Sequence, residues 1–341
     1  MTALKFGLGL CLVLAAAQVA EAKTSKILAD PDAQWQSLSH AGNVSASGIA
    51  EGRDGMVYVV DITNVQPPTP NPYGTLFRYN PKTGETSKAL EPSGQTNGLT
   101  LSPKGDLLMA QGPYGGGRAL SSLDLKTGKL TVLADHYNGK PFIGLNDLAV
   151  DARGRIYFTD ARYSATETPE LANAVYRRDP DGKITVISTD LLRPNGLKVS
   201  PDGKRLYVSD TVSARLKDNP LGPATDKFGI THGGVVVYDL DGAGNISNGR
   251  LFWRNDEMMA DGLAIDTDGN LYIAAWERPD KRMIVALSPQ GKEIEQLPLP
   301  EKGNTNQIAF GRGDDAGTLY VTTSGPWGFY SIKTKKKGYV F

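Results

Sequence analysis

A short pattern that recurs six times along the chain limits its fold more than any other feature. Each copy has a polar residue, usually followed by glycine, then an alternating apolar stretch, a turn containing Asp or Gly, and a second apolar strand. The six leading polar residues are Ser47, Asn97, Asn146, Asn195, Asp261 and Asn306. Their spacings are 50, 49, 49, 66 and 45 residues, and a second hairpin lies between successive copies. Two hairpins in about 50 residues are typical of one β-propeller blade.

The repeat predicts an all-β fold, a six-bladed β-propeller with four-stranded antiparallel blades. The alternation of Ile156 and Phe158 favours strands over helices. An open solenoid of strands is the alternative, but balanced hairpins without a helical layer argue against it. To close the ring, we expect Gly328–Lys333 to form a strand of the sixth blade. We expect Trp35–Leu38 to pair into that blade as its outer strand, which removes an open edge.

The first 22 residues have the layout of a secretory signal peptide. Lys5 precedes an apolar run over residues 6–17, and small residues at Ala20 and Ala22 flank Glu21. The run is too short for an anchored membrane helix, which needs about 20 residues. We therefore expect cleavage after Ala22, a single mature domain over residues 23–341, and a periplasmic or secreted location without a stable membrane anchor.

Composition excludes several classes of function. Lys+Arg and Asp+Glu both total 37, so charge gives no reason to expect binding to nucleic acid or an anionic membrane. The only cysteine, Cys11, lies in the expected signal peptide, so the mature chain has no disulfide, thiol nucleophile or Cys-ligated zinc. No Gly-x-Ser-x-Gly motif supports a serine hydrolase. The expected partner is a small molecule, and the sequence does not predict an oligomeric state.

The six leading residues are the candidate site. The first strand of each propeller blade lines the central channel, so these residues should form a ring at one mouth. Such an oxygen-rich cup suits a hard cation such as Ca²⁺. The alternative is that Asn-Gly and Asp-Gly only start strands through turn chemistry. Loops at the same mouth form its rim, and the longest covers residues 211–234. For substrate binding we expect Asn97, Arg162, Tyr163, Asp210 and His232, with His232 also a candidate acid or base.

Several motifs give the chain a family resemblance. They are residues 146–151, 154–160, 193–197, 206–210 and 261–266. With them the chain resembles the SMP-30/gluconolactonase family over nearly all of its mature length. Phosphotriesterase-like and strictosidine synthase-like propellers share looser forms of these motifs.

The resemblance implies a set of metal ligands. Enzymes of this family bind one divalent cation at the channel mouth through a Glu, an Asn and an Asp, with a further Asn near the substrate. By motif, Asn195 and Asp261 are ligands, and Asn146 is the substrate-side residue, itself a ligand in some relatives. Ser47 stands where the Glu is expected, and a cation would reach it through water. Glu51 cannot replace that Glu, because four residues of strand place it roughly 13 Å away.

The implied activity is metal-dependent hydrolysis of a sugar lactone in the cell envelope. Asp261 would be a metal ligand and would also take the proton from water, while Asn146, Arg162 and Tyr163 position the substrate. The cation would be Ca²⁺, with Zn²⁺, Mg²⁺, Mn²⁺ or Fe²⁺ as alternatives. Ser47 favours a second interpretation, a non-catalytic propeller that binds a ligand or protein. A third, an organophosphate hydrolase, would use the same cup.

Overall fold

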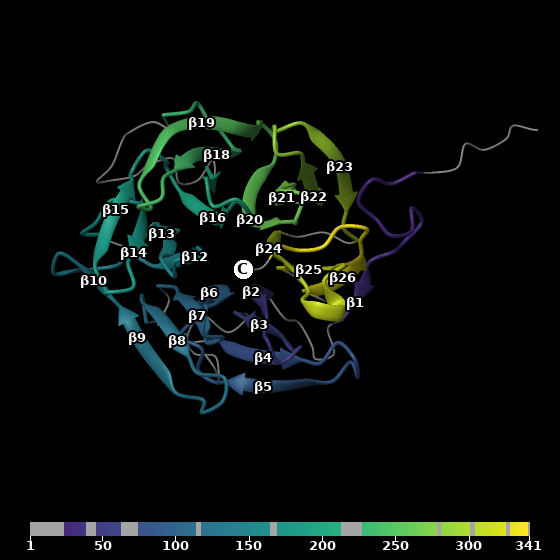
Figure 1. The fold of residues 1–341 in the computed structure, drawn as a ribbon, viewed down its shortest axis with the longest axis horizontal. Coiled ribbons are helices and arrows are strands. Elements are labelled where there is room, and N and C mark those ends of the chain that lie inside the picture. Colours follow the sequence, from purple (N-terminus) through teal and green to yellow (C-terminus); the bar gives the residue numbers. More distant parts are fainter. Residues whose placement is uncertain are drawn as a thin grey trace, which may run out of the picture.

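A computed structural model of the chain shows six antiparallel four-stranded sheets around a central channel (Figure 1). It describes residues 24–38, 46–62, 74–113, 117–163, 169–212, 227–277, 281–300, 304–324 and 328–339. The all-β, six-bladed propeller predicted from the repeat is confirmed. The expected signal peptide, residues 1–22, lies outside the described residues.

Blades 1 to 3 follow the sequence from the channel outwards. Blade 1 contains β2 (Ala46–Glu51), β3 (Val57–Asp61), β4 (Thr75–Tyr79) and β5 (Thr86–Leu90). Blade 2 contains β6 (Thr96–Leu101), β7 (Leu107–Gln111), β8 (Leu120–Leu123) and β9 (Leu130–Ala134). Blade 3 contains β12 (Leu145–Val150), β13 (Ile156–Asp160), β14 (Ala174–Arg178) and β15 (Ile184–Ser188). A small hairpin, β10 (His136–Tyr137) and β11 (Lys140–Pro141), lies between blades 2 and 3 in the chain.

Blades 4 and 5 have the same order, and blade 6 takes its outer strand from the start of the chain. Blade 4 contains β16 (Pro194–Val199), β17 (Arg205–Thr211), β18 (Gly233–Leu240) and β19 (Ile246–Asn255). Blade 5 contains β20 (Met259–Ile265), β21 (Leu271–Glu277), β22 (Lys281–Leu287) and β23 (Glu293–Pro298). Blade 6 contains β24 (Thr305–Phe310), β25 (Thr318–Thr323), β26 (Phe329–Lys333) and β1 (Gln36–Ser37). The 3₁₀ turn η1 (Gly313–Asp315) is the one helical segment among the described residues.

Strand β1 closes the ring as predicted, over a shorter span than Trp35–Leu38. Gln36 pairs with Ser331 and Ser37 with Tyr330 on β26. The segment before β1 also reaches the neighbouring blade 5. There Trp35 Nε1 donates a hydrogen bond to the Pro298 carbonyl at 2.8 Å. The start of the described chain therefore holds blades 5 and 6 together as well as completing blade 6.

The hydrophobic core lies between adjacent blades. In the largest aromatic group, Phe142, Phe158 and Tyr176 contact one another with ring centroids 5.3–5.4 Å apart. Leu108 and Ala110 from blade 2 pack into the same buried cluster. Each blade thus buries its faces against its two neighbours, which keeps the channel-lining strands in fixed relative positions.

Close approach between blades explains the glycine that follows most leading residues. Gly48, Gly98, Gly196 and Gly262 each lie beside the main chain of the next blade. A Cβ atom at these positions would be 2.5–2.8 Å from the carbonyl oxygen of that blade's leading residue. Packing around the channel therefore requires glycine there, and turn chemistry does not explain these dipeptides.

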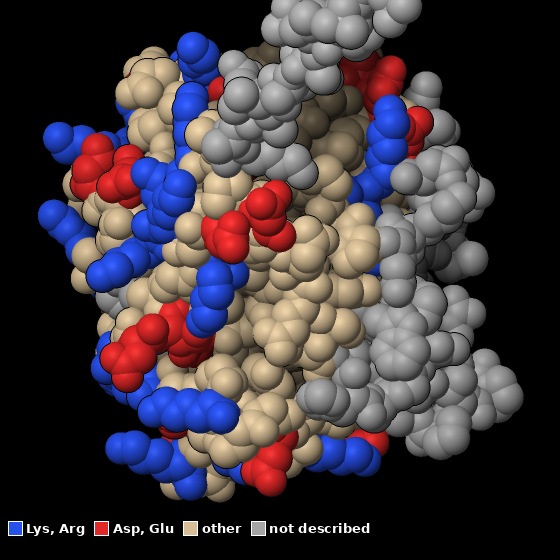
Figure 2. Space-filling view, turned by 90° about the vertical axis from the view of Figure 1, so that its right-hand side faces the viewer, with Lys and Arg blue, Asp and Glu red and all other residues tan. Residues whose placement is uncertain are grey.

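The surface agrees with the balanced composition. On the face in Figure 2, basic and acidic side chains are interspersed and form no large patch of one sign. Within the described ranges there is no helix long and apolar enough to cross a membrane.

Candidate active site

The structure brings the six leading residues together around one mouth of the channel. Each lies near the start of an innermost strand, and hydrogen bonds join most neighbouring blades at this level. Three leading side chains make such bonds themselves. Ser47 Oγ donates to the Asn97 carbonyl at 3.2 Å, Asn97 Nδ2 to Leu145 O at 3.0 Å, and Asn306 Nδ2 to Ala46 O at 2.6 Å. These three residues therefore hold the ring together.

The other three leading residues, Asn146, Asn195 and Asp261, belong to the consecutive blades 3 to 5 and are called here the polar triad. Side chains from the second strands make the interblade bonds in this part of the ring. Thr159 Oγ1 donates to the Asn195 carbonyl and Ser209 Oγ to the Asp261 carbonyl, both at 2.7 Å. The side chains of Asn195 and Asp261 make no such bond to a main-chain carbonyl; they hydrogen-bond each other, and Asn195 Oδ1 remains available to a ligand.

Asn195 and Asp261 have an environment suited to binding. The Asn195 side chain is 2 % exposed, and its Oδ1 has no hydrogen-bond partner among the described residues. Trp276, at the end of β21, donates from Nε1 to Asp261 Oδ2 at 3.2 Å. Burial raises the pKa of Asp261 to about 7, while hydrogen bonds from Trp276 and Asn195 oppose the rise and the charge of Asp147 adds to it. The contact of Trp276 with the carboxylate was not predicted from the sequence.

Tyr163, one of the predicted substrate residues, lies beside the triad. Its hydroxyl donates to the Pro194 carbonyl at 3.2 Å, next to Asn195. The Arg193 guanidinium lies 5.6 Å from the centroid of the tyrosine ring. Burial, followed by the charge of Asp261, raises the Tyr163 pKa well above its ordinary value, so the phenol stays protonated. Arg193 was not predicted, although it directly precedes Pro194-Asn195 in the motif.

Asp210, expected to contact substrate, holds the backbone of a neighbouring segment. The residue is fully buried, and its two carboxylate oxygens accept the backbone N–H groups of Leu192 and Arg193 at 3.0 and 2.6 Å. Asp160 does the same in blade 3, where it accepts from Ile143 and Gly144. This carboxylate holds the chain that enters a channel strand, and contact of Asp210 with substrate stays a prediction.

The remaining predicted substrate residues are partly exposed. Arg162 directly precedes Tyr163, and its backbone N–H donates to Asn173 Oδ1 at 2.9 Å. His232 precedes β18 at the end of the long loop, of which residues 213–226 lie outside the described residues. Asn97 is half-buried and holds Leu145 as described above. Contact of these side chains with substrate stays a prediction.

Two side chains fill the channel one residue below the leading ring. Blades 3 and 6 carry Asp147 and Gln307 where the other blades have glycine, and both are buried. A Cβ on Gly98 would lie 2.7 Å from Asp147 Oδ1, and one on Gly262 would lie 2.1 Å from Gln307 Oε1. Burial raises the Asp147 pKa, and a hydrogen bond from Gln307 opposes that rise. This pair lies between the cup and the other end of the channel.

The cup has the donor chemistry of a hard-cation site with little charge. It offers one carboxylate and the carboxamide oxygens of Asn146 and Asn195, which are ligands that Ca²⁺ accepts. No group of three or more His, Cys, Asp or Glu residues that could hold a metal occurs in the described part of the chain. Glu51 lies at the other end of the first strand, as its spacing predicted.

Comparisons with known proteins agree with this geometry. A family model for the SMP-30/Gluconolactonase/LRE-like region matches residues 114–325. The chain belongs to this family. A gluconolactonase from Zymomonas mobilis is 33 % identical over 268 residues, covering 69 % of each chain. A pentonolactonase from Haloferax volcanii is 25 % identical over 254 residues, covering 74 % of this chain and 75 % of the relative. The solved structure of a Xanthomonas campestris gluconolactonase has a TM-score of 0.70 and 22 % identity, covering 89 % and 90 %, and supports the fold.

Proposed function

We propose that this chain hydrolyses lactones, with the polar triad at its reaction centre. The observation that carries the proposal is the Asn195 carboxamide oxygen, which is buried beside Asp261 without a partner among the described residues. Leaving a buried acceptor unsatisfied costs about 1–3 kcal/mol, a cost that a ligand in the cup would remove. The similarity to a gluconolactonase and a pentonolactonase supports a lactone as substrate.

The residues of the cup fit a divalent cation, and we include one, Ca²⁺ first, in the proposal. Asn195 and Asp261 would hold it, with Asn146 as a further ligand or a substrate contact. A cation bound there polarises the ester carbonyl and lowers the pKa of water. Binding would be weak for this family, because the number of charged ligands sets affinity in such sites and the cup has only one carboxylate.

Side chains of the protein would accept the proton of the attacking water and transfer it to the leaving group. Asp261 accepts a proton from the water that attacks the lactone carbonyl carbon, and the bond from that carbon to the ring oxygen then breaks. The same carboxyl returns the proton to the departing ring oxygen, which completes the addition of one water. The Trp276 N–H fixes the orientation of Asp261, and the protonated Tyr163 hydroxyl, which donates to the Pro194 carbonyl, lies on the substrate side of the triad.

For substrate and location, we propose a sugar lactone hydrolysed in the periplasm or outside the cell. The substrate class follows the names of the two relatives. Export rests on the charge, apolar run and small residues within residues 1–22. Mass spectrometry of the N-terminus after expression in a secreting host tests it, and a chain that retains residues 1–22 would reject it.

A non-catalytic binding propeller is the second candidate. The observation in its favour is Ser47, which replaces an expected carboxylate and turns its hydroxyl to the Asn97 carbonyl. Binding of a sugar lactone without turnover would support this interpretation.

Hydrolysis of glucono-1,5-lactone, followed by acid release after subtracting the spontaneous rate, tests the proposal. We expect Asp261→Asn to lower kcat at least 100-fold, since general-base catalysis contributes about 10²–10⁴-fold. Asp268→Asn makes the same change on an exposed residue at the other end of blade 5 and should leave the rate unchanged. EDTA should lower the parent rate and Ca²⁺ should restore it. Full activity in Asp261→Asn would reject the reaction centre.

A further inference from the structure

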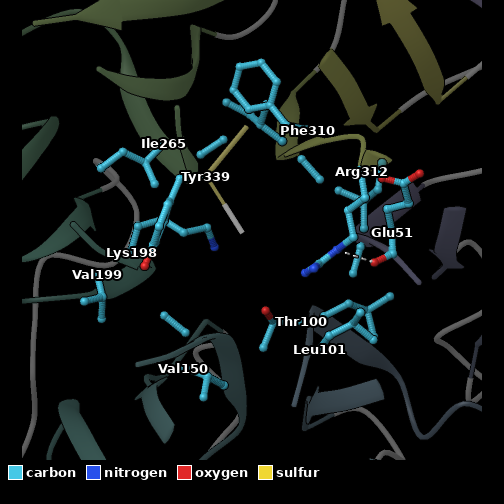
Figure 3. A pocket seen from close by; sticks show the side chains of 17 residues that line it. Glu51, Thr100, Leu101, Val150, Lys198, Val199, Ile265, Phe310, Arg312 and Tyr339 are labelled. Atoms are coloured by element: carbon cyan, nitrogen blue, oxygen red, sulfur yellow. Dashed lines mark hydrogen bonds between the residues drawn. The ribbon is translucent and has the colours of Figure 1, made fainter. Parts of the chain in front are cut away.

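A second cavity lies at the end of the channel opposite the cup. This distal pocket has a volume of about 100 Å³ and is lined by the far ends of all six innermost strands, with Arg312 and Tyr339 (Figure 3). Its wall is mainly apolar and includes Leu101, Val150 and Ile265. The Asp147–Gln307 layer lies between this pocket and the polar triad, so the two are separate sites.

Two cations and a hydroxyl point into the distal pocket. Figure 3 shows the Lys198 amino group and the Arg312 guanidinium approaching from opposite sides, with the Thr100 hydroxyl near the middle. Lys198 and Thr100 occupy the third position after the leading residue of their blades. The four equivalent residues are all alanine: Ala50, Ala149, Ala264 and Ala309. The small alanines leave open space into which the lysine and threonine reach.

The positive charge of the distal pocket is only partly neutralised. Lys198 Nζ lies 3.8 Å from Asp147 Oδ2. Arg312 Nε donates to the uncharged backbone carbonyl of Glu51 at 3.0 Å. Arg312 forms no ion pair with a carboxylate among the described residues. Burial lowers the pKa of Arg312, which means that its charge is poorly solvated. A partly buried guanidinium without a counter-ion favours an anion.

Glu51 lies next to Arg312 but does not supply that negative charge at neutral pH. Its side chain is 4 % exposed and Oε2 has no partner among the described residues. Burial, with a contribution from the Asp315 charge, raises the Glu51 pKa to about 8. A neutral carboxylic acid beside the pocket leaves Arg312 unpaired.

We propose that the distal pocket binds a small oxyanion, phosphate or a short carboxylate, between Arg312 and Lys198. Arg312 keeps its Nη donors for the anion, and Lys198 and Thr100 add donors from the other side and the middle. A cavity of this volume holds several water molecules or one ion of a few heavy atoms, and a sugar lactone does not fit. The bound ion would join elements of blades 2, 4 and 6 across the channel.

Calorimetric titration of the mature protein with inorganic phosphate and with acetate, in EDTA and low-chloride buffer, tests the proposal. We expect a dissociation constant on the order of 1 mM for at least one anion, and a melting temperature that rises with its concentration. Arg312→Met and Lys198→Met should weaken binding at least tenfold, the size expected for a charged hydrogen bond. Lys104→Met removes an exposed lysine at the same end of the molecule and should bind as the parent does.

Further variants separate this site from the others. Thr100→Val removes only a hydroxyl, should fold normally, and should weaken binding several-fold, which keeps the test valid if a charge variant does not fold. Asp261→Asn should bind phosphate like the parent even if it lacks lactonase activity. Absence of binding at about 50 mM anion, well above the expected constant, or unchanged binding in both charge variants would overturn the proposal. Loss of binding in Asp261→Asn would also overturn it.

Discussion

Single side-chain hydrogen bonds divide the leading ring into structural and chemical halves. Asn306 donates from Nδ2 to Ala46 O and to Ser324 Oγ, whereas Asn195 Oδ1 has no partner among the described residues. Two asparagines at equivalent positions of the repeat therefore have opposite energetic roles. A buried polar group that makes hydrogen bonds to its neighbours adds stability, and one without a hydrogen-bond partner in the unliganded protein reduces it.

Alanine at these two positions should separate stability from activity. Asn306→Ala loses two buried hydrogen bonds and should lower the free energy of unfolding by about 1–3 kcal/mol. Asn195→Ala removes an unsatisfied acceptor together with the hydrogen bond to Asp261, and because these two effects have opposite signs, stability should change by less than about 1 kcal/mol, while lactone hydrolysis falls at least tenfold. Urea unfolding and steady-state kinetics measure both. A large stability loss in Asn195→Ala with normal kinetics in its folded fraction would contradict this division.

Ser47 decides how tightly the cup can hold a cation. Ser47→Glu adds a second carboxylate at the position where the family resemblance expects one, so divalent-cation affinity should increase about tenfold or more. Lactonase activity at low metal should rise with it. Ser47→Ala is the matched control, since it also loses the hydrogen bond to Asn97 but gains no ligand. If calorimetry shows Ca²⁺ binding no tighter in Ser47→Glu than in the parent, the cation does not use this cup.

Glu51 should make stability depend on pH. Its folded pKa, about 8, lies above the ordinary value of 4.5 because of burial and Asp315, while Arg312 opposes and Asp54 adds to the shift. Between about pH 4.5 and 8, Glu51 therefore keeps its proton in the folded state and loses it in the unfolded state. Its contribution to stability is greatest below about pH 4.5 and is lost as the pH rises through about 8. At about 1.4 kcal/mol per pKa unit, Glu51→Gln should recover on the order of 2–4 kcal/mol of that fall. Unfolding curves of parent, Glu51→Gln and the exposed control Glu293→Gln at pH 5 and 8.5 measure it; parallel losses in all three would disprove the assignment.

At the scale of elements, the strands of each blade are placed by their contact with the next blade. Gly196, on β16, lies with its Cα against β20, where a Cβ would be 2.5 Å from the Asp261 carbonyl oxygen and 2.9 Å from the Gly262 Cα. The nearest atoms are all backbone atoms of β20, so no flexible side chain there can move away. The distance between β16 and β20 is therefore fixed at the residue that follows Asn195.

Alanine at Gly196 should push these two strands apart. Overpacking of this kind costs about 1–3 kcal/mol, which corresponds to a melting temperature several degrees lower, and the shift of Asn195 and Asp261 should reduce kcat as well. Gly242→Ala, whose Cβ would meet its first atom only at 3.6 Å, is the control and should behave like the parent. Equal melting temperatures for the two variants would show that the strands can separate without cost.

The elements were more predictable from the sequence than the contacts between them. Alternation and turn residues are local, so the repeat predicted six blades, the closing strand and the ring of leading residues. The role of Asp210 was not predictable, because a motif carboxylate that binds backbone N–H groups looks in sequence like one that faces a ligand. Nor did the sequence show that Ser47, Asn97 and Asn306 donate to main-chain carbonyls of the next blade, while in blades 3 and 4 the hydroxyls of Thr159 and Ser209, on the second strands, make these bonds.

For the molecule as a whole, the two chain ends meet in one blade, and this joint maintains the ring. Besides the β1–β26 pairing, Leu38 N–H donates to Phe329 O at 2.9 Å, and Ser25 Oγ donates to Glu295 Oε2 on β23 at 2.9 Å. The cup and the distal pocket each combine residues from blades far apart in sequence. Both sites therefore depend on a closed ring, although no residue of β1 touches either one.

Removal of residues 23–38 from the mature chain should open this joint. β26 would then present an unpaired edge, and the apolar contacts of Ile27, Leu28 and Trp35 with blades 5 and 6 would be lost. We expect a melting temperature at least 10 °C lower, by the usual scaling of roughly 2–4 °C per kcal/mol, and self-association through the free edge in size-exclusion chromatography. A variant lacking only residues 23 and 24 is the control and should resemble the parent, because the contacts of the N-terminal segment with blade 5 begin at Ser25. A shortened chain that stays monomeric and melts with the parent would show that the other five blades hold the ring closed without the N-terminal strand.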